Sequence, residues 1–217
     1  MILIDKPAGI SSFGVVARVR GRLRNEFGHK IKIGHTGTLD PFATGLLILL
    51  SGKMTKKSSE FLKLDKEYIA TLKLGYVSTT GDTEGEIRSY SDRGDNPEVI
   101  ELNMIKSVVG SFIGKIEQIP PKYSAIKING ERAYKLARKG QEFEMPSRKV
   151  EIYDIEVLKY RYPELVIRCE VSSGTYIRTL AEDIGYKLGM GAYLTALRRT
   201  KIGDYKIEDA VKLESFD

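Results

Sequence analysis

The longest aliphatic run, Leu46-Leu47-Ile48-Leu49-Leu50, places the strongest constraint on what this chain can fold into. Five consecutive aliphatic residues predict a β-strand. The run is far short of the roughly 20 apolar residues that a membrane-spanning helix needs. A chain of 217 residues is long enough for one large core, or for a core with a small appendage. We therefore expect a soluble globular protein.

Two further features narrow the class of protein. The first seven residues include Asp5 and Pro7 where a signal peptide would need a basic start and a long apolar stretch. Cys169 is the single cysteine and there are two histidines, too few for an internal disulfide or the usual Cys/His metal cluster. The sequence therefore predicts a cytoplasmic protein that uses no metal.

Positive charge is concentrated in two blocks. The formal net charge of the chain is +6, and residues 1–66 and 120–150 carry net charges of +7 and +5. Such blocks are typical of a protein that binds a polyanion. On this observation alone, solvated charge on an ordinary basic protein is an equally good interpretation.

The order of expected elements indicates an α+β fold rather than a doubly wound sheet, because strands and helices occur in runs. The first helix has a predicted core face of Phe13, Val16, Val19 and Leu23, with Ser11 or Ser12 as its cap. No linker or repeat divides the chain. We expect strands near 2–4, 46–50, 66–75, 150–160 and 165–171, and helices near 12–27, 53–62, 97–109 and 175–189.

The segment Gly34-His35-Thr36-Gly37-Thr38-Leu39-Asp40-Pro41 is the strongest local signal for chemistry. Pro41 restricts Asp40 toward extended backbone, and glycines at 34 and 37 allow close approach of another chain. This pattern suits a carboxylate presented from a loop on a rigid scaffold. The alternative is an ordinary Asp-Pro turn.

Two more segments carry candidate binding residues. Ser173-Gly174 leads into a helix whose first turn contains Arg178, where the helix dipole disfavours a cation. Arg178 therefore serves an acidic partner or a phosphate, or else it pairs on the surface with Glu182. In Pro120-Pro121-Lys122-Tyr123-Ser124-Ala125-Ile126-Lys127, basic and aromatic side chains alternate, which favours phosphate attraction and base stacking. Lysines along a solvated surface explain the same composition.

These segments, together and in this order, resemble the TruB family of tRNA pseudouridine synthases. The resemblance covers nearly the whole chain. It implies isomerisation of the uridine at position 55 in the T arm of tRNA, with no cofactor. It also implies a bent, mixed, mostly antiparallel sheet flanked by helices, with a central RNA-binding cleft. The matching motifs are Asp5-Lys6-Pro7, Gly9-Ile10-Ser11-Ser12, residues 34–47, Lys66-Glu67-Tyr68, residues 120–127, residues 173–178 and Leu197-Arg198-Arg199.

The resemblance also implies a role for individual residues. Asp40 corresponds to the nucleophile, which attacks either the sugar C1′ or the pyrimidine C6, and Arg178 corresponds to its cationic partner. Tyr68 would stack on the base and assist proton transfer, and His35 would fill the space left by the flipped nucleotide. Tyr176 and Leu197 would line the uracil pocket.

For the whole chain, the resemblance implies one catalytic domain over residues 1–217, with residues 120–145 as a thumb-like RNA-binding insertion that is loosely held without RNA. The family's C-terminal accessory RNA-binding domain is expected to be absent. We expect a monomer that binds the tRNA T stem-loop without an obligate protein partner. A tRNA-folding chaperone and a uridine in another RNA remain as alternatives. The expected RNA contacts are Lys6, Lys122, Tyr123, Lys127 and Arg132.

Overall fold

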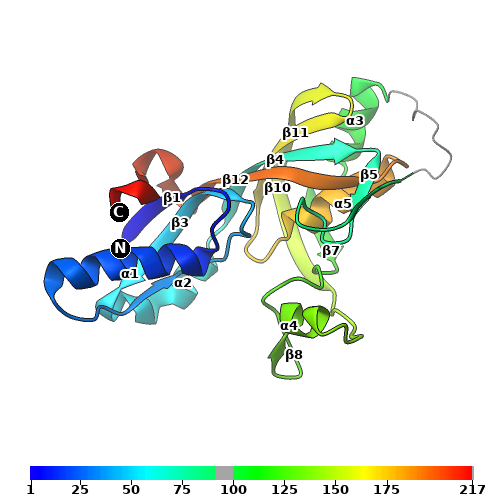
Figure 1. The fold of residues 1–217 in the computed structure, drawn as a ribbon. Helices are drawn as coiled ribbons and strands as arrows, with labels where there is room; N and C mark the ends of the chain where they lie inside the picture. The colour runs from blue at the N-terminus through cyan, green and yellow to red at the C-terminus, as the bar shows by residue number, and fades with distance from the viewer. Residues whose placement is uncertain (91–99, 217) are drawn as a thin grey trace. The chain divides into compact units, whose positions relative to one another are not determined.

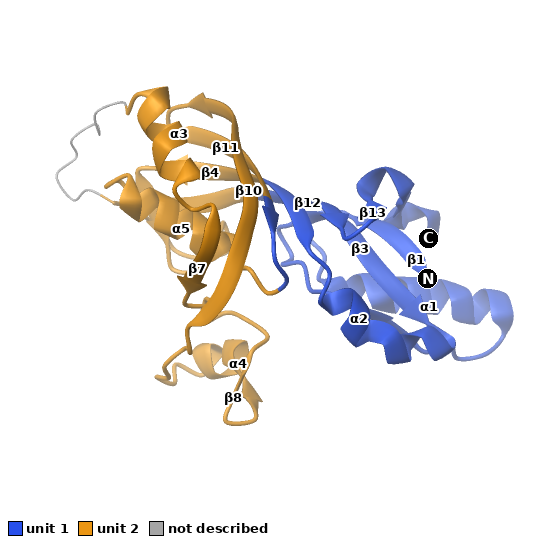
Figure 2. Cartoon of the chain, turned by 180° about the vertical axis from the view of Figure 1, so that it is seen from behind, with its two compact units in different colours: residues 1–69, 170–173, 196–217 blue, residues 70–169, 174–195 orange. Residues whose placement is uncertain are grey.

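The computed structural model describes residues 1–90 and 100–216, and it has the mixed α+β architecture that the sequence predicts. The chain forms two compact units (Figure 2). Unit 1 comprises residues 1–69, 170–173 and 196–217, and unit 2 comprises residues 70–169 and 174–195. Strands β4 (Lys66–Leu74) and β12 (Ala192–Ile202) each continue from one unit into the other. The expected single domain over residues 1–217 stays a prediction.

Ten of the described strands form one mixed sheet. Two separate two-stranded sheets consist of β5 (Tyr76–Ser78) with β6 (Ile87–Ser89), and of β8 (Lys127–Ile128) with β9 (Glu131–Arg132). The order of the large sheet is β14 (Val211–Lys212), β1 (Ile2–Lys6), β3 (Thr44–Ser51), β12, β4, β11 (Glu164–Val171), β10 (Arg148–Arg161) and β7 (Gly114–Gln118). In addition, β13 (Tyr205–Lys206) pairs with β12, and β2 (Ile33–His35) pairs with β3. β1 pairs with β3 in antiparallel register, whereas β1 with β14 and β12 with β3 run parallel. The mixed sheet and flanking helices are confirmed, and the expected bend and cleft stay predictions.

Unit 1 is built around the aliphatic run identified in the sequence, whose five residues are all buried. They form most of β3, and α1 packs beside this strand and β1 (Figure 1). The elements that lie wholly in unit 1 are β1 (Ile2–Lys6), α1 (Ser12–Phe27), β2 (Ile33–His35), β3 (Thr44–Ser51), η1 (Gly52–Lys57), α2 (Ser58–Leu62), β13 (Tyr205–Lys206), η2 (Ile207–Asp209), β14 (Val211–Lys212) and η3 (Leu213–Phe216).

The buried face of α1 differs from the expected one at a single position. Phe13 is 65% exposed, whereas Val15, Val16 and Val19 are buried and Leu23 packs against them. At 100° per residue, Phe13 lies a quarter-turn from the centre of this face, and Val15 takes its place. Including Phe13 in the core was therefore wrong.

Two other expectations need correction. The segment 53–62 is a 3-10 helix followed by a five-residue α-helix rather than one helix. The eleven-residue strand β12 was not expected at all. Two consecutive charged residues, Arg198 and Arg199, interrupt the alternation of apolar and polar positions that would otherwise predict a strand.

In unit 2, α3 (Leu102–Gly110) packs on β10 and on α5 (Ile177–Lys187) (Figure 2). α5 ends at Lys187, two residues before the expected end, and the expected start of α3 at 97 lies outside the described residues. No helix in the described ranges is long and apolar enough to span a membrane. The elements of unit 2 are β5 (Tyr76–Ser78), β6 (Ile87–Ser89), α3 (Leu102–Gly110), β7 (Gly114–Gln118), β8 (Lys127–Ile128), β9 (Glu131–Arg132), α4 (Ala133–Arg138), β10 (Arg148–Arg161), β11 (Glu164–Val171) and α5 (Ile177–Lys187).

The segment 120–145 has secondary structure of its own. β8 and β9 form a two-stranded hairpin that leads into α4. Backbone hydrogen bonds from Ala133 to Ile126 and from Tyr134 to Ser124 fold the segment back on itself. Whether it is loosely held without RNA stays a prediction.

Candidate active site

Asp40 lies in the loop between β2 and β3, and this loop is held at several points. The Pro41 carbonyl accepts from Lys6 Nζ (3.1 Å) and from the Gly9 amide (2.9 Å). The Leu39 amide and carbonyl both bond Ser12 Oγ. Two fixed peptides therefore flank Asp40, whose side chain is half-buried. A carboxylate on such a backbone is presented in one place rather than sampling many.

A buried arginine secures the start of the same loop. Arg199 Nη2 donates to the Gly37 carbonyl (3.2 Å) and Nε donates to the Leu46 carbonyl (2.8 Å). Gly37 has φ of +145°, and Gly45 leaves room where a Cβ would collide with the Arg199 backbone. Of the two glycines noted in the 34–41 segment, Gly37 has a positive φ, which favours glycine. Gly34 has open space where a Cβ would lie, and the close backbone approach occurs at Gly45 instead.

The other site residues expected in unit 1 come from β2, β4 and β12. His35 ends β2, and its Nδ1 lies 3.4 Å from the Gly37 amide. Tyr68 is buried on β4. Leu197 is buried on β12, and its carbonyl accepts from Thr44 Oγ1 at 3.5 Å.

The residues before Tyr68 are fixed by polar contacts. Lys66 Nζ donates to the carbonyls of Leu62 and Leu64. Burial, with repulsion from the Arg199 charge, lowers the pKa of Lys66 to about 8. Glu67 is buried and accepts from Thr200 Oγ1 (2.6 Å). Strand β4 is therefore anchored directly before the tyrosine.

Arg178 is held within unit 2 and is not a surface residue. Its guanidinium donates to the carbonyls of Thr80 (3.0 Å) and Tyr123 (2.9 Å), and Nη1 lies 3.3 Å from Asp82 Oδ2. The side chains of Arg178 and Asp82 are 6% and 2% exposed. The alternative of a surface pair with Glu182 is wrong, because the first turn of α5 is buried.

Sequence reasoning missed Asp82. Its Oδ1 accepts from Thr80 Oγ1 (2.5 Å) and from the Glu84 amide (2.9 Å), so both carboxylate oxygens are used. The local sequence Ser78-Thr79-Thr80-Gly81-Asp82 has the composition of an ordinary polar turn. Only the contact with Arg178, 96 positions along the chain, distinguishes it.

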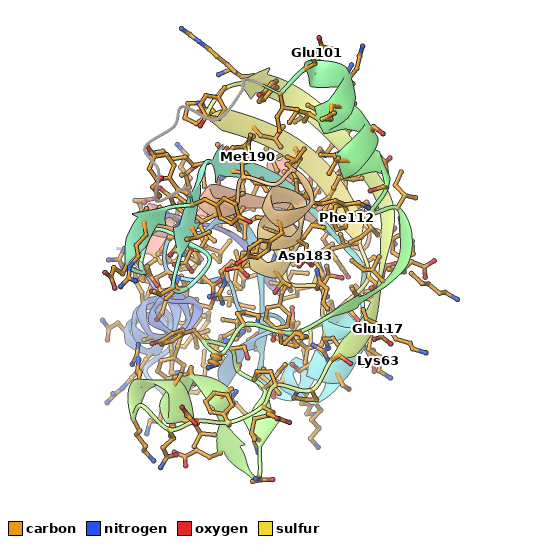
Figure 3. The ribbon with its side chains drawn as sticks, turned by 90° about the vertical axis from the view of Figure 1, so that its right-hand side faces the viewer. Lys63, Glu101, Phe112, Glu117, Asp183 and Met190 are labelled. Carbon is orange, nitrogen blue, oxygen red and sulfur yellow. The ribbon has the colours of Figure 1, made fainter. Side chains whose placement is uncertain are left out.

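Acidic side chains on α5 extend this cluster. Burial raises the pKa of Glu182 to about 7; the nearby charges of Asp183 and Asp82 raise it as well, and Arg178 opposes them. Burial also raises the pKa of Asp183, which Figure 3 labels on α5. Asp82 and Glu182 thus both interact with one buried guanidinium, and Asp183 interacts with Glu182.

Tyr176, the residue before α5, is held by a glutamine. Its amide donates to Gln118 Oε1 (3.0 Å) and its carbonyl accepts from Gln118 Nε2 (3.3 Å). Gln118 is buried at the end of β7, whereas the preceding Glu117 is exposed. This reciprocal pair fixes the backbone two residues before Arg178, and no local sequence pattern predicts it.

The residues expected to bind RNA fall into two groups. Lys122, Tyr123, Lys127 and Arg132 are exposed on the 120–145 segment. Lys6 is fully buried, and its ammonium donates to the carbonyls of Pro7, Ile10 and Pro41. It braces the Asp40 loop and does not face solvent, so we leave Lys6 out of the proposed RNA contacts.

The expected site residues are thus divided between the two units. Unit 1 contains Asp40, His35, Tyr68 and Leu197, and unit 2 contains Arg178 and Tyr176 together with the exposed segment. Each unit fixes its own share of them by polar contacts to backbone. The pairing of Asp40 with Arg178 stays a prediction.

Comparison with known proteins identifies the class. Residues 24–177 match the family described as TruB family pseudouridylate synthase (N terminal domain). Residues 178–217 match the tRNA pseudouridylate synthase B C-terminal domain. Both descriptions are of pseudouridylate synthases, the class that the ordered motifs indicate. The expected absence of the family's C-terminal accessory RNA-binding domain stays a prediction.

Individual relatives agree with this class. The chain is 46% identical over 217 residues to the tRNA pseudouridine synthase B of Phocaeicola vulgatus, covering 100% of the chain and 91% of that relative. Identity to the enzyme of the same name from Clostridium tetani is also 46%, covering 100% of the chain and 72% of that relative. The chain therefore belongs to the TruB family of pseudouridylate synthases.

Solved structures agree in fold. A chain in the crystal structure of a Cbf5-Nop10-Gar1 complex matches with a TM-score of 0.72 and 33% identity over 98% of this chain. A chain in an H/ACA RNP bound to a substrate RNA matches with a TM-score of 0.69 and 31% identity over 98% of this chain. The chain spans about half the length of both, 52% and 50%.

Proposed function

We propose that the protein isomerises uridine to pseudouridine in tRNA, at position 55 of the T arm. Family membership across the whole chain supports the reaction class. The observation that carries the site is the loop at 34–41, where fixed peptides on both sides present the Asp40 carboxylate. The exposed basic and aromatic residues of the 120–145 segment support an RNA substrate.

In the proposed reaction, the bond between uracil N1 and the sugar C1′ breaks and a bond from C5 to C1′ forms. Asp40 acts as the nucleophile at C1′ or at C6 and is regenerated when the product forms. The proton on C5 leaves and N1 gains one, so atoms balance and no oxidant is needed. No step requires a cofactor.

The remaining residues assist these steps. Tyr68 stacks on the base and assists removal of the C5 proton, while His35 stabilises the extruded nucleotide state. Arg178 keeps the nucleophile charged and aimed. We place the activity in the cytoplasm of the cell and expect the enzyme to act as a monomer on the T stem-loop.

The test combines product mapping with a matched pair of variants. Purified protein is incubated with an unmodified tRNA transcript, and pseudouridine is mapped by position. Asp40→Asn should lower turnover more than about 10³-fold and leave RNA binding nearly intact, because the amide keeps the shape but is a poor nucleophile. Asp204→Asn, on an exposed turn, should leave turnover unchanged.

Each alternative has its own outcome in this assay. Pseudouridine at another position would assign a different uridine. Tight binding without any pseudouridine would favour the chaperone interpretation. Turnover of Asp40→Asn within a few-fold of the unaltered protein would place the chemistry on another residue.

A further inference from the structure

Ser12 makes contacts that its place in the sequence does not explain. It is the first residue of α1 and is 1% exposed. The helix is capped by its neighbour Ser11, whose hydroxyl accepts from the Gly14 amide at 3.0 Å. The Ser12 hydroxyl is therefore not needed for helix capping and is free to serve another part of the fold.

That other part is the peptide before Asp40. Ser12 Oγ accepts from the Leu39 amide at 2.8 Å and donates to the Leu39 carbonyl, also at 2.8 Å. One hydroxyl thus bonds both polar groups of one residue, as a neighbouring strand does in a hydrogen-bonded pair. Leu39 is itself buried, so without Ser12 these two groups would lose their partner away from water.

The other anchors of the loop lie elsewhere. Lys6 and Gly9 bond the Pro41 carbonyl after Asp40, and Arg199 bonds Gly37, three residues before it. Pro41 in turn restricts the backbone of Asp40 itself. The backbone before the carboxylate is therefore held by the Ser12 clamp, and the backbone after it by Pro41 and its partners.

We propose that Ser12 is a positioning residue, which clamps the Leu39 peptide and thereby sets where the Asp40 carboxylate sits. The proposal rests on the proposed function of Asp40 as nucleophile. In this role Ser12 acts through the Leu39 backbone, which its hydroxyl contacts. Its contribution is to geometry, so losing it lowers the rate of the chemical step rather than the affinity for RNA.

Neighbouring serines provide a matched control. Ser12→Ala removes both bonds to Leu39, and Ser11→Ala removes only the cap bond to Gly14. Both substitutions delete one hydroxyl at the start of the same helix. Ser12→Cys keeps the volume and a weak hydrogen-bonding group, so it remains testable if Ser12→Ala does not fold.

The first measurement does not depend on activity. Amide hydrogen exchange should show the Leu39 amide exchanging at least about tenfold faster in Ser12→Ala than in Ser11→Ala, with Ser12→Cys between them. Unchanged exchange at Leu39 would show that the clamp does not exist and would overturn the proposal. This holds whether or not Asp40 proves to be the nucleophile.

The second measurement is the kinetics on tRNA. Ser12→Ala should lower kcat about 10- to 100-fold, with KM and the tRNA dissociation constant within about twofold of the unaltered protein. Ser11→Ala should change kcat less than about twofold, and Ser12→Cys should recover part of the loss. A rise in KM at constant kcat, or equal effects of the two alanine variants, would refute a positioning role. A fully active Asp40→Asn would instead refute the proposed function.

Discussion

Removing the charge of Asp82 tests the buried ion pair of unit 2 most directly. In Asp82→Asn, the remaining Oδ1 can still accept from Thr80 and Glu84. Oδ2, however, is replaced by an amide donor that faces the donors of Arg178, 3.3 Å away in the original pair. The guanidinium then keeps its carbonyl partners but loses the Asp82 carboxylate.

The expected cost follows from burial. Breaking a buried pair by removing one charge costs about 3–5 kcal/mol, and here the two side chains are 6% and 2% exposed. The Glu182 carboxylate also interacts with Arg178, which compensates part of the lost charge. We therefore expect the lower end, about 3 kcal/mol, a large share of the 5–15 kcal/mol typical of a folded domain.

A partly exposed pair in the same unit provides the control. Asp154 lies 2.6 Å from Arg168, with side-chain exposures of 48% and 29%. Arg168 also reaches Glu156 at 3.3 Å, so Asp154→Asn should cost less than about 1 kcal/mol. The same substitution is thus made in a buried and in a partly exposed Asp–Arg pair.

The assay is urea unfolding followed by far-UV circular dichroism, because the chain contains no tryptophan. Free energies come from linear extrapolation, with unchanged m-values as a condition. If the two units unfold in separate steps, the substitution should lower the urea midpoint of the step assigned to unit 2. If the two variants lose the same free energy of unfolding to within about 0.5 kcal/mol, the buried-pair reasoning is refuted.

Two other predictions concern the same unit. The raised pKa of Glu182, about 7 against an ordinary 4.5, stabilises the fold below pH 4.5, and this contribution is lost as the pH rises through 7. Relative to the unaltered protein, the free energy of unfolding of Glu182→Gln should therefore rise by up to about 3 kcal/mol between pH 4 and pH 9. A difference in this free energy that stays constant with pH in urea unfolding would contradict the prediction. Gln118→Met removes both bonds to Tyr176 and should lower kcat/KM on tRNA about tenfold. Glu117→Gln, on the exposed neighbour, should leave it unchanged, and equal effects would argue against the clamp on Tyr176.

The sequence predicted those elements whose signal is local. β3 follows from an unbroken aliphatic run, and α1 follows from spaced valines after a serine cap. β12 was missed because Arg199 lies inside the strand, where its buried guanidinium donates hydrogen bonds to the carbonyls of Leu46 and Gly37. These hydrogen bonds form only after the strands have come together, so no local sequence pattern predicts them.

The same distinction between local and long-range signals applies to the residues of the candidate site. The loop around Asp40 was recognisable because proline restricts the backbone locally and glycine permits a positive φ. Asp82 and Gln118 were not recognisable, since their partners Arg178 and Tyr176 lie 96 and 58 positions away. The residue proposed to react is recognisable from the local sequence pattern around it, whereas the residues that hold the site in place mostly are not.

Buried cations change how the basic composition should be interpreted. Lys6 and Lys66 belong to the block with net charge +7, yet both ammonium groups donate to backbone carbonyls inside unit 1. Neither can touch a phosphate, so neither adds to the counterions released when RNA binds. The salt dependence of tRNA binding should therefore reflect exposed side chains such as Lys122, Lys127 and Arg132. A count of lysines and arginines along the sequence overstates that dependence, because part of the positive charge stabilises the loop that carries Asp40 and the strand that carries Tyr68.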